Sequence, residues 1–228
     1  AANGQGQVIG IVAEAGMGKS RLVAEIVRSA RRKGFVGYGG ACQSDAIHTP
    51  YQGWRSVWQA FFDIDPEHPP RKQMRLLEGE IEDRAPTRTD AMPLLNVVLD
   101  LQIPDNDFTQ PLEPKVRQST LHALLEECLK AAAQDDPILV VIEDLHWIDT
   151  LSRELLEQLA AAMASHPVAF VLAYRPGAVE SGPGSRFEAL PQFTRVALRE
   201  LTRDEAELAI RAKLAQLYPA RGGALPAG

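Results

Sequence analysis

A lysine and a serine follow a short glycine-containing turn near the start of the chain, and residue types in this order can bind phosphate. Residues 8–13 are mostly apolar, residues 14–18 include two glycines, and Lys19-Ser20 follow directly. Glycines let backbone N–H groups approach phosphate oxygens, because glycine lacks a Cβ atom and adopts positive φ angles. The lysine would contact the β- and γ-phosphates, and the serine hydroxyl would bind Mg²⁺. We therefore predict a phosphate-binding loop at the N-terminus of a helix, which itself attracts anions.

This loop departs from the usual pattern G-x-x-x-x-G-K-[ST] at its first position, where Ala13 stands, while Gly16 adds a glycine inside the loop. The alternative is an ordinary strand, turn and helix with an accidental Gly-Lys-Ser. The position after an apolar run and before an amphipathic helix favours nucleotide binding. The candidate nucleotide-binding residues are Ala15, Gly16, Met17, Gly18, Lys19, Ser20 and Arg21.

Two acids end a second apolar run. Residues 138–142 are Ile-Leu-Val-Val-Ile, and Glu143 and Asp144 follow. Beside a phosphate-binding loop, one carboxylate at a strand tip would hold Mg²⁺ and a second would orient or polarise an attacking water. The alternative is a buried strand followed by a solvated turn, but the pairing with the loop favours the acidic strand.

Arg175 ends a third apolar run, residues 168–174. An arginine at the carboxyl end of a parallel strand lies at the crevice where such sheets bind ligands, so Arg175 could sense a γ-phosphate. The alternative is a surface arginine. His146 has no histidine or cysteine partners at ligand spacing, which argues against a metal site. We expect Trp147 to be a packing residue and Asp149 to be the N-cap of a helix over 150–164.

The elements that would position these residues follow from apolar spacing. Residues 19–33 have helical spacing and end in basic residues before Gly34, and residues 35–42 read as a strand. This β-loop-α-β unit implies a parallel sheet with a right-handed crossover. A last strand is expected over 194–198, and Thr202-Arg203-Asp204-Glu205 is a capping box that opens a further helix.

Residues 43–115 are rich in proline and are predicted to be a helical insertion. The aromatic residues of 51–62 have helical spacing, which indicates core packing rather than a base-stacking site. Shorter helices are expected over 71–83 and 94–101, followed by an amphipathic helix over 116–133. Residues 177–192 and 219–228 are predicted to be loops.

Composition narrows the class of protein. The chain has 228 residues, 45% of them hydrophobic, and a formal net charge of −6. This acidic balance and the lack of a long basic run argue against nucleic-acid binding. Cys42 and Cys128 do not form a disulfide framework, no apolar run is long enough to span a membrane, and polar residues 1–7 do not read as a signal peptide. We expect a cytoplasmic module of a longer protein.

The motifs together resemble one known class. Residues 10–22 read GIVAEAGMGKSRL, residues 140–150 VVIEDLHWIDT, residues 172–176 LAYRP and residues 194–208 TRVALRELTRDEAEL. These blocks, with CQSDAIHTPYQGWR at residues 42–55, are similar to the STAND class of signal-transduction ATPases. The nearest likeness is to the ATPase module of class III adenylate/guanylate cyclases and of large LuxR-type regulators, over nearly the whole chain.

The resemblance implies an α/β fold, specifically an ASCE-type P-loop NTPase. Its three α/β/α layers would contain a parallel sheet of order 5-1-4-3-2. The NTPase domain would cover residues 1–200, with the insertion at 43–115, and residues 201–228 would begin a truncated helical lid. By position, Gly18, Lys19 and Ser20 would bind phosphates. Ser20 and Glu143 would bind Mg²⁺, whereas Asp144 is the second acid and Arg175 the sensor arginine.

The implied function is an ATP-binding and hydrolysing regulatory switch, with ATP or ADP and Mg²⁺ bound. Its partners would be an output domain in the same parent chain and, in an ATP-dependent manner, further copies of the protein. The alternative is a scaffold module that holds nucleotide with little turnover. A P-loop kinase is a weaker alternative, because no phosphoacceptor site stands out. Ala13 and Glu143, the latter where many relatives have aspartate, are departures from the class.

Overall fold

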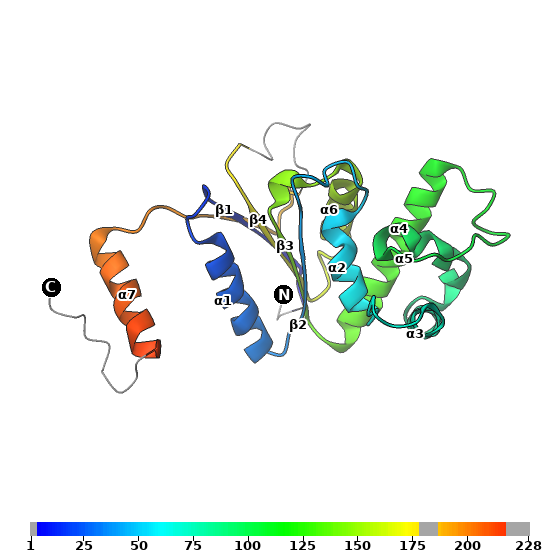
Figure 1. The fold of residues 1–228 in the computed structure, drawn as a ribbon, viewed down its shortest axis with the longest axis horizontal. Coiled ribbons are helices and arrows are strands. Elements are labelled where there is room, and N and C mark those ends of the chain that lie inside the picture. Colours follow the sequence, from blue (N-terminus) through cyan, green and yellow to red (C-terminus); the bar gives the residue numbers. More distant parts are fainter. Residues whose placement is uncertain (1–3, 178–186, 218–228) are drawn as a thin grey trace. The chain divides into compact units, whose positions relative to one another are not determined.

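The computed structural model describes residues 4–177 and 187–217, and the chain divides into two compact units, residues 1–197 and 198–228. In the first unit, helices cover both faces of a five-stranded parallel sheet (Figure 1). The strands are β1 (Gln7–Val12), β2 (Val36–Ala41), β3 (Ile138–Glu143), β4 (Val168–Tyr174) and β5 (Phe193–Ala197). The three apolar runs of the sequence form β1, β3 and β4, and the strands expected over 35–42 and 194–198 form β2 and β5.

The strands follow the order β2-β3-β4-β1-β5, and each neighbouring pair is parallel. The predicted order 5-1-4-3-2 is this order read from the opposite edge, so the α/β fold class is confirmed. β4 lies between β1 and β3. Because parallel strands end at the same edge, the phosphate loop after β1, the acids after β3 and Arg175 after β4 come to one edge of the sheet.

Helix α1 (Lys19–Arg32) covers one face of the sheet. On the other face lie α2 (Gln52–Phe61), α5 (Pro114–Asp135) and α6 (Thr150–Ala162), as Figure 1 shows. Alternate residues of the strands point to these helices and form the main core with them. The strand residues in this core include Val8, Ile138, Val140, Ile142, Val168, Phe170 and Leu172.

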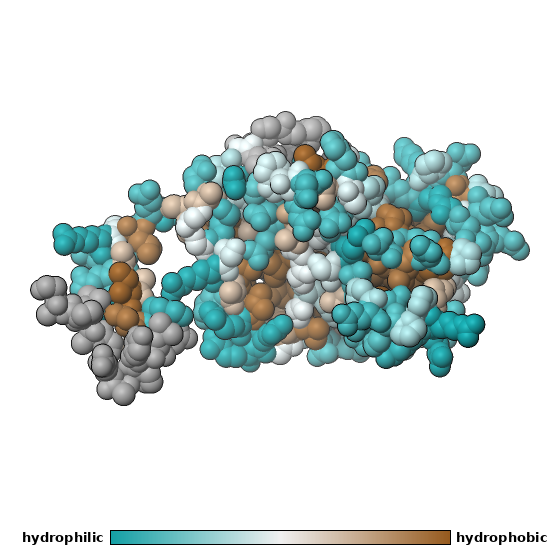
Figure 2. Space-filling view, in the orientation of Figure 1, coloured by the Kyte–Doolittle hydropathy of each residue, from teal (hydrophilic) through white to brown (hydrophobic). Residues whose placement is uncertain are grey.

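The α1 face of the sheet is less completely covered. A hollow of about 280 Å³ lies between α1 and the strands, with Ile9, Leu139 and Val171 on its floor and Ile26 of α1 on its wall. Figure 2 shows apolar surface beside α1 in this region. On the neighbouring strand, an added Cβ atom at Gly39 would meet no atom within 4 Å, so β2 is open on this side as well.

The insertion is helical, as predicted, and packs directly on the sheet. Trp54, Trp58 and Phe62 have at most 1% of their surface exposed, which confirms that these aromatic residues belong to the core. The insertion continues with α3 (Pro70–Arg84), a 3₁₀ segment η1 (Pro86–Leu95) and α4 (Asn96–Leu99).

The helix predicted over 94–101 is wrong in its bounds. Pro93 lies within the 3₁₀ segment and Asp100 adopts a left-handed conformation with φ 59°, so only four residues remain α-helical between them. Residues 94 and 95 belong to the 3₁₀ segment, and the left-handed turn at Asp100 ends the helix before residue 101. The predicted helix 150–164 ends two residues early, at Ala162, and the helix predicted over 116–133 is two residues longer at each end.

The second unit contains α7 (Arg203–Leu217). The predicted capping box is present, because the Glu205 N–H donates to Thr202 Oγ1 at 3.3 Å and the Thr202 N–H donates to Glu205 Oε2 at 2.8 Å. Leu208 and Ile210 of α7 are more than half exposed. That this unit begins a lid stays a prediction. The loop predictions for 178–186 and 219–228 lie outside the described residues.

Both cysteines are free and buried. Burial raises the pKa of Cys42 and of Cys128 to about 12, which keeps both as unreactive thiols. None of the helices in the described part of the chain combines the length and the apolar character that crossing a membrane requires.

Candidate phosphate-binding site

The loop between β1 and α1 has the backbone conformation that its glycines predict. Gly16 and Gly18 have φ angles of 79° and 88°, in the left-handed region. A Cβ atom at either position would meet no atom within 4 Å. Glycine therefore suits these positions because of the backbone conformation, and not because a side chain would lack space. Gly18 is also the N-cap of α1, so the first N–H groups of the helix face the loop.

Ala13 fits the loop without strain. It is buried, it is not among the residues with positive φ, and its N–H donates to the carbonyl of Tyr174 at 3.2 Å. This hydrogen bond continues the pairing of β1 with β4 by one residue. An alanine is therefore compatible with this backbone at the first position of the pattern.

The Lys19 ammonium lies over the loop. Its Nζ donates to the carbonyl of Ala13 at 2.8 Å and to the carbonyl of Glu14 at 2.9 Å. An ammonium group has three N–H donors, so one donor remains for a phosphate oxygen.

Ser20 and Glu143 are in direct contact although they are 123 residues apart. Ser20 Oγ donates to Glu143 Oε2 at 2.6 Å. Both groups are hard oxygen donors of the kind that Mg²⁺ prefers. Among the described residues, no group of three or more histidine, cysteine, aspartate or glutamate side chains is placed to hold a metal ion. This pair therefore fits an ion that takes its other ligands from phosphate and water.

Asp144 has an unusual backbone. Its φ and ψ are 52° and 39°, in the left-handed region, where aspartate is one of the few side chains found with any frequency. Such conformations are costly and tend to occur at functional sites. The turn ends β3 and turns the chain into η2 (Leu145–Trp147), leaving the Asp144 side chain 53% exposed. The sequence motif did not reveal this conformation.

His146 lies close to the predicted site residues. It was not predicted to be one of them. Its side chain is 5% exposed, and Nδ1 lies 4.0 Å from Asp144 Oδ1. Burial is the main cause that lowers the pKa of His146, and the positive charges of Arg175 and Lys19 lower it further, against the opposing effect of Asp144. The pKa of the imidazole is thus affected by charged groups from the segments that follow β1, β3 and β4. Its place two residues after Asp144 was the available signal.

Arg175 follows the last residue of β4 and is exposed. Since β4 lies between β1 and β3, Arg175 stands at the edge between the phosphate loop and the acids. Its effect on the pKa of His146 agrees with this position.

Asp149 serves as a helix cap, as predicted. Its Oδ1 accepts a hydrogen bond from the Ser152 N–H at 2.9 Å, and the residue is buried. The same oxygen accepts from the Tyr51 N–H at 3.4 Å, and Trp54 Nε1 donates to the carbonyl of Ser152 at 3.0 Å. The cap therefore also ties the start of α2 to the segment that follows the acids.

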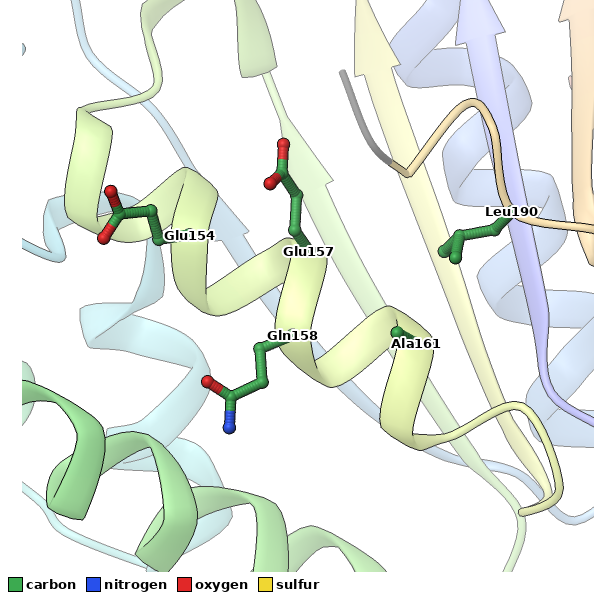
Figure 3. Close-up of a pocket in the computed structure, with 5 residues that line it drawn as sticks. All are labelled: Glu154, Glu157, Gln158, Ala161 and Leu190. Carbon is green, nitrogen blue, oxygen red and sulfur yellow. The ribbon is translucent and has the colours of Figure 1, made fainter. Parts of the chain in front are cut away.

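Another hollow, of about 440 Å³, lies beside α6 and is drawn in Figure 3. Glu154, Glu157 and Gln158 line it along α6, and Leu190 reaches it from the segment before β5. None of the predicted phosphate or metal residues lines this hollow.

Comparison with known proteins agrees with the phosphate site. The family model described as "AAA ATPase domain" matches residues 1–171. A relative from Rhizobium meliloti (strain 1021), "Uncharacterized protein R02095", is 32% identical over 219 residues, which is 92% of this chain and 20% of the relative. The chain thus spans about a fifth of the length of the relative that it matches.

Proposed function

The chain belongs to the AAA ATPase domain family, and from this premise we propose that it is an ATP-binding and hydrolysing switch module of a larger signalling protein. The observation that carries the proposal is the contact of Ser20 with Glu143, beside the Lys19 ammonium. An oxygen pair that suits Mg²⁺ next to a phosphate loop is what nucleoside-triphosphate hydrolysis requires. The finer assignment to the STAND class rests on the sequence blocks alone.

Each residue would have one task. The backbone of residues 15–18 would bind phosphate oxygens, and Lys19 would pair with their charge. Ser20 and Glu143 would hold Mg²⁺, which neutralises developing negative charge when bound. Asp144 would orient the attacking water, and Arg175 would contact the γ-phosphate. ATP and ADP would then leave Arg175 in different surroundings, which is how a switch distinguishes them.

Lys19→Ala tests the proposal. The variant loses the charged donor to phosphate, so we expect ATP and ADP to bind about 10- to 150-fold more weakly, which corresponds to about 1.5–3 kcal/mol for a hydrogen bond to a charged group. Titration calorimetry with Mg²⁺ present measures both affinities. Lys33→Ala, at the other end of α1, is the matched control and should bind like the parent chain.

Phosphate release by the same proteins separates the two forms of the proposal. Turnover in the parent chain that disappears in Lys19→Ala supports a hydrolysing switch. Binding without turnover indicates the scaffold alternative. Equal nucleotide affinity in Lys19→Ala and the parent chain would contradict the phosphate-loop assignment.

A further inference from the structure

His146 is a buried imidazole with both ring nitrogens unpaired. Its side chain is 5% exposed, and neither Nδ1 nor Nε2 has a hydrogen-bond partner within the described ranges. Leaving a buried polar group unpaired costs about 1–3 kcal/mol, and such groups are rare in native structures. The candidate site thus contains a buried imidazole whose ring nitrogens can each take a hydrogen-bond partner.

The surroundings of His146 point to one partner. Nδ1 lies 4.0 Å from Asp144 Oδ1, about 1 Å beyond an ordinary N–H···O distance. The ring also lies near that of Trp147, with ring centroids 5.0 Å apart. Burial and the nearby positive charges favour the neutral imidazole, which can donate one N–H and accept at its other nitrogen.

Asp144 needs such a partner for its proposed task. Its carboxylate is half exposed, so solvent does not hold it in one orientation. A carboxylate that orients water acts well only when its own rotamer is fixed by neighbouring hydrogen bonds. The left-handed turn at Asp144 brings its side chain and that of His146 to the same place.

We infer that His146 is a positioning residue for Asp144: with nucleotide bound, its Nδ1–H donates to the Asp144 carboxylate and fixes it toward the attacking water. The inference rests on the proposed function, because the water and the γ-phosphate belong to ATP hydrolysis. It goes beyond that function by assigning a role to a residue outside the phosphate loop and the acid pair.

The ring nitrogens can be observed without turnover. We expect ¹⁵N NMR of histidine-labelled protein with Mg²⁺ and a non-hydrolysable ATP analogue to show a protonated, hydrogen-bonded Nδ1 for His146. Asp144→Ala should remove this signature, and His146→Asn identifies the resonance among the five histidines. Ring signals that do not respond to Asp144→Ala in the nucleotide-bound protein would overturn the inference.

Calorimetry on the same samples separates this result from the proposed function. If the analogue binds and the signals do not respond, only the His146 role fails. If the analogue does not bind at all, the proposed function fails and the His146 role fails with it.

A double-mutant cycle gives the kinetic test. We expect His146→Phe and His146→Gln to lower kcat about 10-fold, the lower end of the loss for supporting residues of this kind, with KM and ADP affinity within about twofold. His146→Asn, whose amide lies near the position of Nδ1, should recover most of the rate. In an Asp144→Asn background, His146→Phe should cost little more. Additive losses, or a loss of Tm that parallels kcat, would refute the positioning role.

Discussion

At the scale of single residues, the contact between Ser20 and Glu143 relates two segments that lie far apart in the sequence. The glutamate carboxylate reaches Ser20 Oγ directly at 2.6 Å. An aspartate at position 143 would be shorter by one methylene group and would not reach as far. The glutamate, a departure from many members of the resembled class, therefore still brings a carboxylate to the serine hydroxyl.

Arg175 carries the residue-scale prediction. A guanidinium stays charged at any working pH and can bind phosphate in a bidentate manner. If it contacts the γ-phosphate, Arg175→Ala should weaken a non-hydrolysable ATP analogue by about 1.5–3 kcal/mol and leave ADP affinity nearly unchanged. Calorimetry with both ligands measures the difference. Parallel losses of affinity for the ATP analogue and for ADP, or no loss for either, would mean that Arg175 is not the sensor. Arg153→Ala, on α6, serves as the control.

Single residues also show how far a sequence can be read. The cap at Asp149 was predictable, because an aspartate before a helix has a local hydrogen-bonding role. The charged surroundings of His146 were not predictable, because they depend on where Arg175 and Lys19 lie after the sheet has formed. The lack of ligand-spaced partners of His146 argued against a metal site but did not reveal the neighbouring carboxylate.

At the scale of elements, two glycines let α2 approach β2. A Cβ atom at Gly40 would lie 2.2 Å from the backbone oxygen of Gly53, and one at Gly53 would lie 2.7 Å from Cys42 Sγ. Such close approach is possible only without side chains. Gly40 of β2 and Gly53 of α2 are therefore part of how the insertion packs on the sheet.

Gly40→Ala should accordingly destabilise the chain by about 1–3 kcal/mol, the usual cost of overpacking. Gly39→Ala is a matched control on the same strand, since its added Cβ would meet no atom within 4 Å. Alanine has less conformational freedom than glycine in the unfolded chain, so this control should be neutral or stabilising by about 0.5–1 kcal/mol. Urea unfolding of the two variants and the parent chain gives the comparison, and equal stabilities of the two variants would contradict the close contact.

Element positions were predicted better than element ends. Apolar runs located the three inner strands β1, β3 and β4, because buried parallel strands are apolar throughout. The strands expected over 35–42 and 194–198 contain glycine or polar residues and correspond to β2 and β5 at the sheet edges. The short helices of the insertion were predicted less well. The end of α4 depends on the left-handed Asp100, whose carboxylate accepts a hydrogen bond from Arg55 of α2 at 2.9 Å, a contact that the local sequence does not show.

At the scale of the whole first unit, a series of hydrogen-bonded side chains, of which Tyr51 and His122 are buried, joins three helices. Tyr51, the N-cap of α2, has its hydroxyl 2.9 Å from Nε2 of His122 on α5. His122 Nδ1 lies 3.2 Å from Oε1 of Gln158 on α6, and Gln158 Nε2 donates to Glu126 Oε2 at 3.0 Å. Because the carboxylate only accepts, the amide must present its oxygen to His122, so Nδ1 carries the proton and the Tyr51 hydroxyl donates to Nε2.

The buried His122 in this series of hydrogen bonds predicts how the stability of the protein depends on pH. Burial is the main cause that lowers the pKa of His122, and the Gln158 hydrogen bond and the Glu154 charge oppose it. In the unfolded chain a histidine titrates near pH 6.5, so below that pH the unfolded state binds more protons than the folded state. The contribution of His122 is therefore fully present above about pH 6.5 and is lost as the pH falls toward its folded-state pKa.

We expect the free energy of unfolding to fall between pH 7.5 and pH 5.5, and His122→Phe to flatten this fall, because phenylalanine keeps an apolar ring and cannot bind a proton. Denaturant unfolding at each pH measures the slope. The pKa of His146 is lowered as well, so part of the slope should remain in the variant. His48→Gln, at an exposed position, is the control and should keep the slope of the parent chain. If His122→Phe and the control share one slope, proton uptake by His122 does not limit the acid stability of the protein.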